Sequence, residues 1–109
     1  MGKEGYKGKE RRSFNRILYN PKERPSIEID DQVFEVADIS EKGLRLVNDK
    51  KTKLDIKFKG KLAFLCGESL DVEGLIVWQE RNELGVQFDT LLPSDVIYKE
   101  QRHILVNGR

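Results

Sequence analysis

The stretch "SIEIDDQVFEVADI", residues 26–39, alternates apolar and polar side chains before a pair of aspartates. Apolar residues at every second position are typical of a strand with one buried face, so Ile27 and Ile29 are expected on the same face. Asp30 and Asp31 interrupt this pattern with side chains that favour turns, and the residues after them are rich in β-formers. The stretch therefore predicts a β-hairpin.

Short strand patterns continue along the rest of the chain. Arg81 and Asn82 are expected to form the turn between the last two strands, and the polar segment 48–53 is expected to be an exposed loop. Gly74 falls inside a strand pattern, where glycine often marks a bulge or a bend that curves a sheet onto itself. The further strands are expected at 43–47, 61–67, 70–80 and 83–88.

The sequence period changes near the end of the chain. Pro93, Ser94 and Asp95 are residues of the kind that start helices. The apolar residues after them recur at spacings compatible with one helical face: Val96, Ile97, Ile104 and Leu105. The sequence therefore predicts a mainly β protein, a small six-stranded antiparallel barrel over about 25–90, closed by one C-terminal helix over about 93–105.

Composition limits the class of protein. A chain of 109 residues, 38% hydrophobic and 36% charged, fits one small domain with a thin core. No apolar run approaches the roughly 20 residues that cross a bilayer, and the first residues lack the apolar region of a secretory signal, so a cytoplasmic protein without a membrane span is expected. Cys66 is the single cysteine and the chain has one histidine. An internal disulfide and a zinc site are therefore excluded, and no metal, cofactor or catalytic residue is expected.

Charge is distributed unevenly along the chain. Residues 1–24 hold eight Lys or Arg and three Glu, a net +5, whereas residues 25–109 hold twelve basic and sixteen acidic residues, a net −4. Residues 1–10 contain three glycines and almost no apolar side chain, so they are expected to be disordered. Residues 11–24 are expected to form a flexible basic arm of the single domain 11–109. Such arms bind phosphate, acidic membrane surfaces or acidic proteins, or are simply solvated.

Three arginines gather in "RRSFNR", residues 11–16. Like charges held close together cost free energy unless an anion lies among them. Arg12 and Arg16 are four positions apart, so they can bracket phosphates or bases on one helical face or along an extended chain. A guanidinium group is a planar fork of donors that matches a phosphate or the O6 and N7 edge of guanine. This spacing is common by chance, however, and alone it decides nothing.

The second motif is "DISEKG", residues 38–43. Its Asp, Ser and Gly are also typical of an ordinary β-turn, and this interpretation stays open. Asp38 and Ser40 are two positions apart on an extended segment, so their side chains are expected on one face. Gly43 beside them would let a ligand approach the backbone. The segment is therefore interpreted as a turn and also as a polar surface for ligand binding, called the ledge.

Taken together, "RRSFNR", "DISEKG", "GLIVW" and "ELGVQF" resemble the PilZ domain, the bacterial receptor module for the second messenger cyclic di-GMP, over about residues 10–92. The resemblance implies that the arm and the ledge clasp the ligand on the outside of a six-stranded barrel. The lysine-rich stretch 48–60 departs from the family pattern. The resemblance implies that Arg12 and Arg16 bind guanine and phosphate, and that Asp38 and Ser40 form hydrogen bonds with the polar edges of the ligand. It also implies that Gly43 leaves space for the ligand, and that Arg11 accompanies a stacked pair of ligand molecules.

The expected function is that of a cyclic di-GMP receptor and adaptor rather than an enzyme. Its arm would order on binding and present a surface to an unknown partner protein, regulating motility, biofilm or related processes. Two alternatives stay open: a ligand-independent PilZ-like adaptor, and a small-barrel RNA or single-stranded DNA module, against which the net charge of +1 argues. Trp78, within a strand, is expected to pack in the core or at a barrel end rather than at a ligand, and His103 is expected on the surface.

Overall fold

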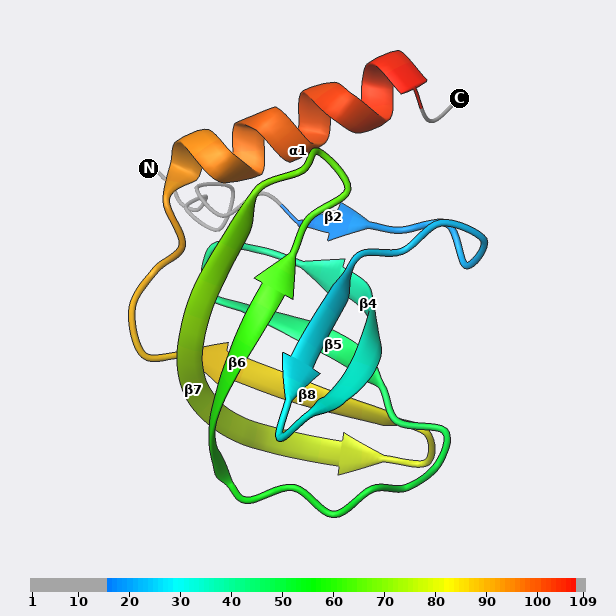
Figure 1. The fold of residues 1–109 in the computed structure, drawn as a ribbon, viewed down its shortest axis with the longest axis vertical. Coiled ribbons are helices and arrows are strands. Elements are labelled where there is room, and N and C mark those ends of the chain that lie inside the picture. The colour runs from blue at the N-terminus through cyan, green and yellow to red at the C-terminus, as the bar shows by residue number, and fades with distance from the viewer. Residues whose placement is uncertain (1–15, 108–109) are drawn as a thin grey trace, which may run out of the picture.

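The computed structural model describes residues 16–107. Six antiparallel strands, β3 to β8, form a barrel in the order β4-β3-β6-β7-β8-β5, and pairing between β5 and β4 closes it. The short β2 adds to β4, and α1 lies across one end of the barrel (Figure 1). The mainly β fold, the six-stranded barrel and the single C-terminal helix were therefore predicted correctly. The elements are β2 (Ile17–Leu18), β3 (Ser26–Ile29), β4 (Gln32–Ile39), β5 (Gly43–Val47), β6 (Lys57–Ala63), β7 (Ser69–Glu80), β8 (Glu83–Phe88) and α1 (Ser94–Asn107).

The predicted hairpin is formed by β3 and β4. Asp30 and Asp31 make the connection with φ angles of 53° and 65°, the left-handed conformation that a two-residue hairpin turn needs and that Asp tolerates. Ile27 pairs with Phe34 across the two strands. Both Ile27 and Ile29 are buried in the core, as their alternation predicted.

Strand β7 is long and bends, and it pairs with two neighbouring strands (Figure 1). Its first half pairs with β6 and its second half with β8, and both pairings include Gly74. A Cβ atom at Gly74 would overlap the backbone carbonyl of Gln87, so only glycine fits at this crossing. The bend predicted there is confirmed. The bulge is not at Gly74, because the register shifts between Ile76 and Trp78.

Strand β6 lies four residues earlier than the sequence pattern indicated, at 57–63 rather than 61–67. Phe58 and Phe64 both pack into the core, but Phe64 lies after the strand and starts a tight turn in which its carbonyl accepts from the Gly67 amide at 3.1 Å. Asn48, expected in an exposed loop, is buried because its side chain bonds the backbone of Thr52 through both amide atoms.

The basic arm was expected to be flexible over 11–24, but its described part, residues 16–24, is docked on the barrel. β2 pairs with the end of β4, and the Tyr19 amide donates to the Ala37 carbonyl at 3.0 Å. Ile17 and Tyr19 are buried in the core. Apolar burial and strand pairing therefore fix this part of the chain. The expected disorder of residues 1–10 lies outside the described residues.

Helix α1 covers the barrel end next to β2. Val96 and Ile97 pack into the core as predicted, whereas Leu105 is exposed. Glu100 is fully buried on the same face, which the sequence did not indicate. The Tyr19 hydroxyl donates to its carboxylate at 2.7 Å. Within residues 16–107 no helix is long and apolar enough to cross a membrane.

Candidate functional site

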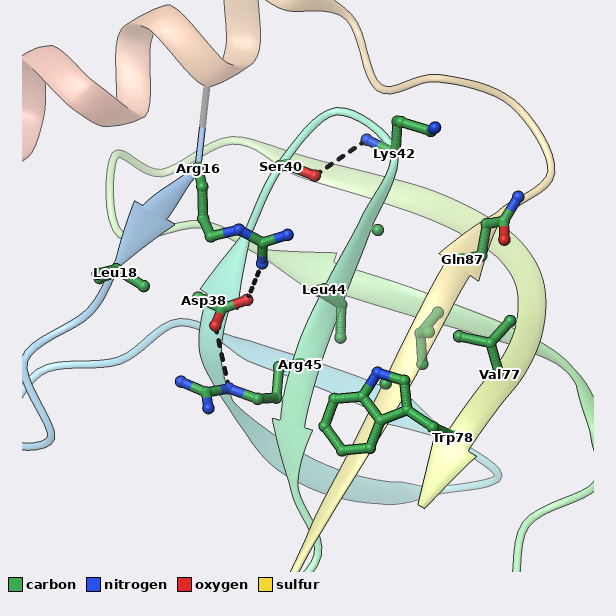
Figure 2. A pocket seen from close by; sticks show the side chains of 13 residues that line it. Arg16, Leu18, Asp38, Ser40, Lys42, Leu44, Arg45, Val77, Trp78 and Gln87 are labelled. Carbon is green, nitrogen blue, oxygen red and sulfur yellow. Dashed lines mark hydrogen bonds and ion pairs between the residues drawn. The ribbon is translucent and has the colours of Figure 1, made fainter. Parts of the chain in front are cut away.

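A groove lies on the outer surface of the barrel, over β4, β5, β7 and β8 (Figure 2). Its volume is about 820 Å³, within the range of about 300–1,000 Å³ that is usual for small-molecule sites. Arg16, Asp38 and Arg45 form its polar side, and Trp78 forms the opposite side. The groove therefore offers charge and an aromatic ring to the same occupant.

The two sequence motifs meet at this groove. Arg16 Nη1 donates to Asp38 Oδ1 at 2.8 Å, although the residues are 22 positions apart. Pairing of β2 with β4, with Leu18 opposite Asp38, brings them together. The Asp38 side chain is only 6% exposed, whereas that of Arg16 is 58% exposed. The carboxylate is thus fixed, while the guanidinium keeps much of its surface open to the groove.

A β-bulge at Ala37 turns Asp38 outward. Phe34 and Val36 face the core, and simple alternation would place Asp38 there as well. The register of β4 against β5 shifts between Val36 and Asp38, so Asp38 pairs with Arg45 on the outer face. Bulges commonly re-aim side chains next to binding sites in this way.

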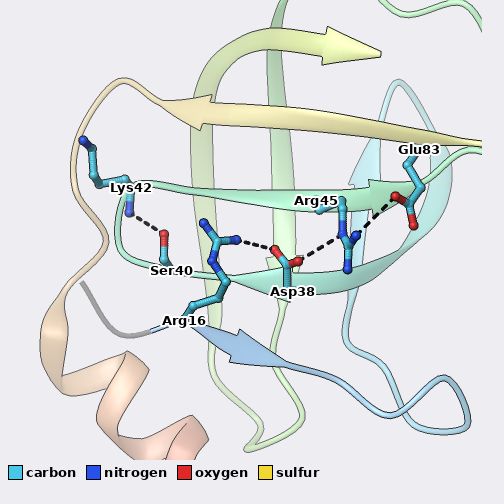
Figure 3. A network of polar contacts seen from close by, with 6 residues as sticks. All are labelled: Arg16, Asp38, Ser40, Lys42, Arg45 and Glu83. Carbon is cyan, nitrogen blue, oxygen red and sulfur yellow. Dashed lines mark hydrogen bonds and ion pairs between the residues drawn. The ribbon is translucent and has the colours of Figure 1, made fainter. Parts of the chain in front are cut away.

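Ser40 both shapes the turn and lines the groove. Its amide donates to the Gly43 carbonyl at 2.8 Å, and its Oγ accepts from the Lys42 amide at 3.3 Å (Figure 3). Because the oxygen is the acceptor in that bond, the hydroxyl proton is directed elsewhere. The turn interpretation of this motif is therefore correct and does not compete with a binding role.

Gly43 has a structural reason to be glycine. A Cβ atom there would overlap the carbonyl oxygen of Val86 on β8, which pairs with β5. The absence of a side chain is thus required by the barrel itself, before any ligand is considered. The residue also lines the groove.

Replacement of Gly43 with alanine is expected to destabilise the fold by about 1–3 kcal/mol, because the added methyl group must push β5 away from β8. In thermal unfolding this corresponds to a midpoint lower by roughly 5 to 20 °C. Glu41→Ala, in the same turn, is expected to stay within about 0.5 kcal/mol of the wild type. Equal midpoints for Gly43→Ala and Glu41→Ala would contradict the role given to this contact.

Trp78 was expected to pack in the core or at a barrel end, but it lies on the outer face of the barrel. Val72, Gly74 and Ile76 turn toward the interior at two-residue spacing, but the register shift after Ile76 changes the phase of the strand. Trp78 is therefore 41% exposed and lines the groove. Its indole lies where a side chain at Gly85 would be, so the absence of that side chain lets the ring lie flat on β8.

Arg45 is a second groove residue that the motif analysis missed. Its Nε lies 3.0 Å from Asp38 Oδ2, as an ion pair without a well-directed hydrogen bond. Its Nη1 bonds Glu83 Oε1 at 3.4 Å. The signal was available, because in "GLRLV" the buried Leu44 and Leu46 flank Arg45 and leave it on the outer face.

Of the six residues assigned to ligand binding from the sequence, the structure brings four to the groove: Arg16, Asp38, Ser40 and Gly43. Arg11 and Arg12 lie outside the described residues. Cys66 packs against the core, as expected. Within residues 16–107 no cluster of three His, Cys, Asp or Glu side chains could hold a metal ion.

Comparison with known proteins gives a family and a similar solved structure. The family model for the PilZ domain matches residues 10–105. Among solved structures, the chain is similar to an uncharacterised protein from Legionella, with 19% sequence identity and a TM-score of 0.59, over 87% of this chain and 91% of that one. At this identity the likeness shows a shared fold. None of the curated proteins matches the chain.

Proposed function

Because the chain belongs to the PilZ domain family, a family of cyclic di-GMP receptors and adaptors, we propose that it binds cyclic di-GMP in the groove between Arg16, Asp38 and Trp78. The proposed role is that of a cytoplasmic receptor that passes the signal to a partner protein, rather than that of an enzyme. One observation carries the proposal more than any other. The arginine motif and the aspartate motif make direct contact, through the 2.8 Å bond between Arg16 and Asp38, on the wall of a groove large enough for a ligand.

The chemistry of the groove suits the ligand. Cyclic di-GMP carries two negative phosphates and two guanines, so it needs cations, acceptors for the guanine N–H groups and a surface for stacking. Arg16 supplies a fork of donors for a phosphate or for guanine O6 and N7. Asp38 supplies acceptors for guanine N1–H and N2–H, and Ser40 supplies a hydroxyl. Trp78 offers an exposed aromatic face, and stacking of one base on such a face is worth about 1–3 kcal/mol.

The remaining arginines of the motif complete the proposed site. Arg11 and Arg12 lie outside the described residues; the proposal assigns Arg12 to guanine and phosphate, and Arg11 to a stacked pair of ligand molecules. Since residues 16–24 are already docked on the barrel, the proposed ordering on binding concerns the residues that precede Arg16. The surface formed there is the one offered to the partner.

The proposal is tested by intrinsic fluorescence, because Trp78 is the single tryptophan of the chain. Cyclic di-GMP is expected to quench its emission in a saturable titration, since a guanine stacked on the indole contacts the emitting ring directly. Cyclic di-AMP has the same phosphates but lacks the guanine N1–H and N2–H groups, which would donate hydrogen bonds to Asp38. It is therefore expected to bind at least about tenfold more weakly.

Two outcomes would go against the proposal. If neither dinucleotide binds by fluorescence or by calorimetry, the hypothesis of a ligand-independent adaptor is favoured instead. If both bind equally, and binding weakens steeply with salt, the groove recognises charge alone. A ligand-specific response that persists at about 150 mM salt supports a site that recognises guanine.

The alternative of a nucleic-acid surface is disfavoured by strand register. Two of the three lysines of β6 lie opposite acidic residues of the neighbouring strands: Lys59 opposite Glu73, and Lys61 opposite both Asp71 and Glu28. Such cross-strand pairs neutralise one another. The lysine-rich segment therefore does not form the continuous positive track that a single strand requires.

A further inference from the structure

Arg45 occupies a position between two carboxylates on the polar side of the groove (Figure 3). Its Nε lies 3.0 Å from Asp38 Oδ2 and its Nη1 lies 3.4 Å from Glu83 Oε1. Arg16 bonds the other Asp38 oxygen, Oδ1. The Asp38 carboxylate is therefore held by one arginine on each oxygen.

The two arginines are held with different rigidity. Arg45 lies on β5, directly opposite Asp38 in a five-residue strand that pairs on both sides, with β4 and with β8. Arg16 immediately precedes the two-residue β2, and its side chain is 58% exposed. When a ligand arrives, Arg16 is the partner that can turn toward it, and Arg45 is the partner that stays.

Departure of Arg16 would create an electrostatic problem if Arg45 were absent. Asp38 is almost fully buried, and the proposed ligand carries two negative charges. A buried carboxylate that loses its cation next to an anion is strongly unfavourable. Some other positive group must neutralise Asp38 while Arg16 contacts the ligand.

We propose that Arg45 is this group, a positioning residue that balances the charge of Asp38 and keeps its carboxylate oriented while Arg16 transfers to the ligand. It retains Oδ2, so that Oδ1 faces the N1–H and N2–H donors of guanine. Glu83 holds the far end of the guanidinium and so fixes its direction. The inference rests on the proposed function, because it assigns a task to Arg45 at the same groove.

The first experiment measures cyclic di-GMP affinity of Arg45→Met by calorimetry. The substitution keeps the apolar stem and removes the charge, and it is expected to weaken binding by about tenfold. Arg102→Met, on the exposed face of α1, removes the same charge outside the groove and is the matched control. It is expected to bind like the wild type.

The second experiment separates neutralisation of Asp38 from simple packing by means of Asp38→Asn. An asparagine side chain carries no charge, so it does not need Arg45. When Asp38→Asn is added to Arg45→Met, the affinity for cyclic di-GMP is expected to stay the same or to recover in part. If the two residues acted independently, the fold-losses in affinity of the two single variants would multiply. A structural role of Arg45 alone would give multiplied losses and would overturn the inference.

The remaining outcomes are also decisive. Wild-type affinity in Arg45→Met would overturn the inference and leave the proposed function intact, whereas absence of binding in the wild type would overturn the proposed function itself. If Arg45→Met unfolds, Arg45→Lys is measured instead, since lysine keeps the positive charge but lacks the planar guanidinium group. Arg45→Lys is then expected to retain more affinity than Arg45→Gln, and equal losses in the two would contradict the account.

Discussion

Replacement of Arg16 with alanine is expected to weaken cyclic di-GMP binding by about 100-fold, or about 2.7 kcal/mol. Charge-assisted hydrogen bonds contribute about 1.5–3 kcal/mol each, and a guanidinium fork makes two of them to a phosphate or to guanine. Part of this gain is offset, because in the structure Arg16 already bonds Asp38 and must exchange that partner. The change is measured by calorimetric titration of the wild type and the variant under the same salt conditions.

Two matched variants are the controls for Arg16→Ala. Arg16→Lys keeps the charge but cannot form the fork, and it is expected to lose about tenfold, between the wild type and Arg16→Ala. Arg102→Ala removes an arginine from the exposed face of α1 and is expected to leave affinity unchanged. Affinity within about twofold of the wild type for Arg16→Ala would remove Arg16 from the site.

Replacement of Glu100 with alanine is expected to destabilise the fold by about 3–5 kcal/mol. Glu100 is fully buried, and its carboxylate accepts from the Tyr19 hydroxyl and from the amides of Leu65 and Cys66, at 2.7, 3.1 and 2.9 Å. Alanine leaves all three donors without this acceptor, the buried Tyr19 hydroxyl among them, and also leaves a cavity. Thermal unfolding is expected to occur roughly 15 to 30 °C lower, which is a large part of the stability of a small domain.

Conservative variants distinguish the hydrogen bonds from packing. Glu100→Gln keeps the volume and one acceptor and is expected to lose less than half as much stability as Glu100→Ala. Tyr19→Phe removes one donor and is expected to cost about 1 kcal/mol. Burial, together with the bond to Glu100, raises the pKa of the Tyr19 phenol above its usual value, so it remains a donor at physiological pH. A loss below about 1 kcal/mol for Glu100→Ala would contradict this account of α1.

This network also connects the helix to the proposed site. Tyr19 is three residues after Arg16, and β2 lies between them. Glu100 therefore ties α1 to the segment that carries the described arginine of the motif.

Local patterns in the sequence predicted the local elements. The hairpin of β3 and β4 followed from the alternation of Ile27 and Ile29 and from two aspartates that tolerate positive φ. The bend of β7 followed from Gly74, because glycine within a strand often marks a bend or a close approach of another strand. These features depend on residues adjacent in the chain, and they were correct.

The outward orientation of Trp78 depends on the register between paired strands, and the residue pattern of β7 alone did not reveal it. The two register shifts, between Val36 and Asp38 and between Ile76 and Trp78, arise in the pairing of β4 with β5 and of β7 with β8. The expectation that an aromatic residue within a strand packs away from ligands therefore misplaced Trp78.

Burial of Glu100 likewise depends on amide donors that lie 34 and 35 residues away in the chain. The spacing of apolar residues on α1 gave no sign of it.

The candidate site was found by motif, and geometry then extended it. The resemblance identified Arg16, Asp38, Ser40 and Gly43, all of which line the groove. It did not identify Arg45, whose position follows from the alternation in β5 together with the outward turn of Asp38.

The central claim, that cyclic di-GMP occupies this groove, is tested most directly by amide and indole chemical shifts in an NMR titration. The shifts are expected to concentrate in segments 16–18, 38–45 and 85–87 and at the indole N–H of Trp78, and to saturate together with one affinity. Unchanged signals in these segments, or shifts confined to another face of the barrel, would contradict the account.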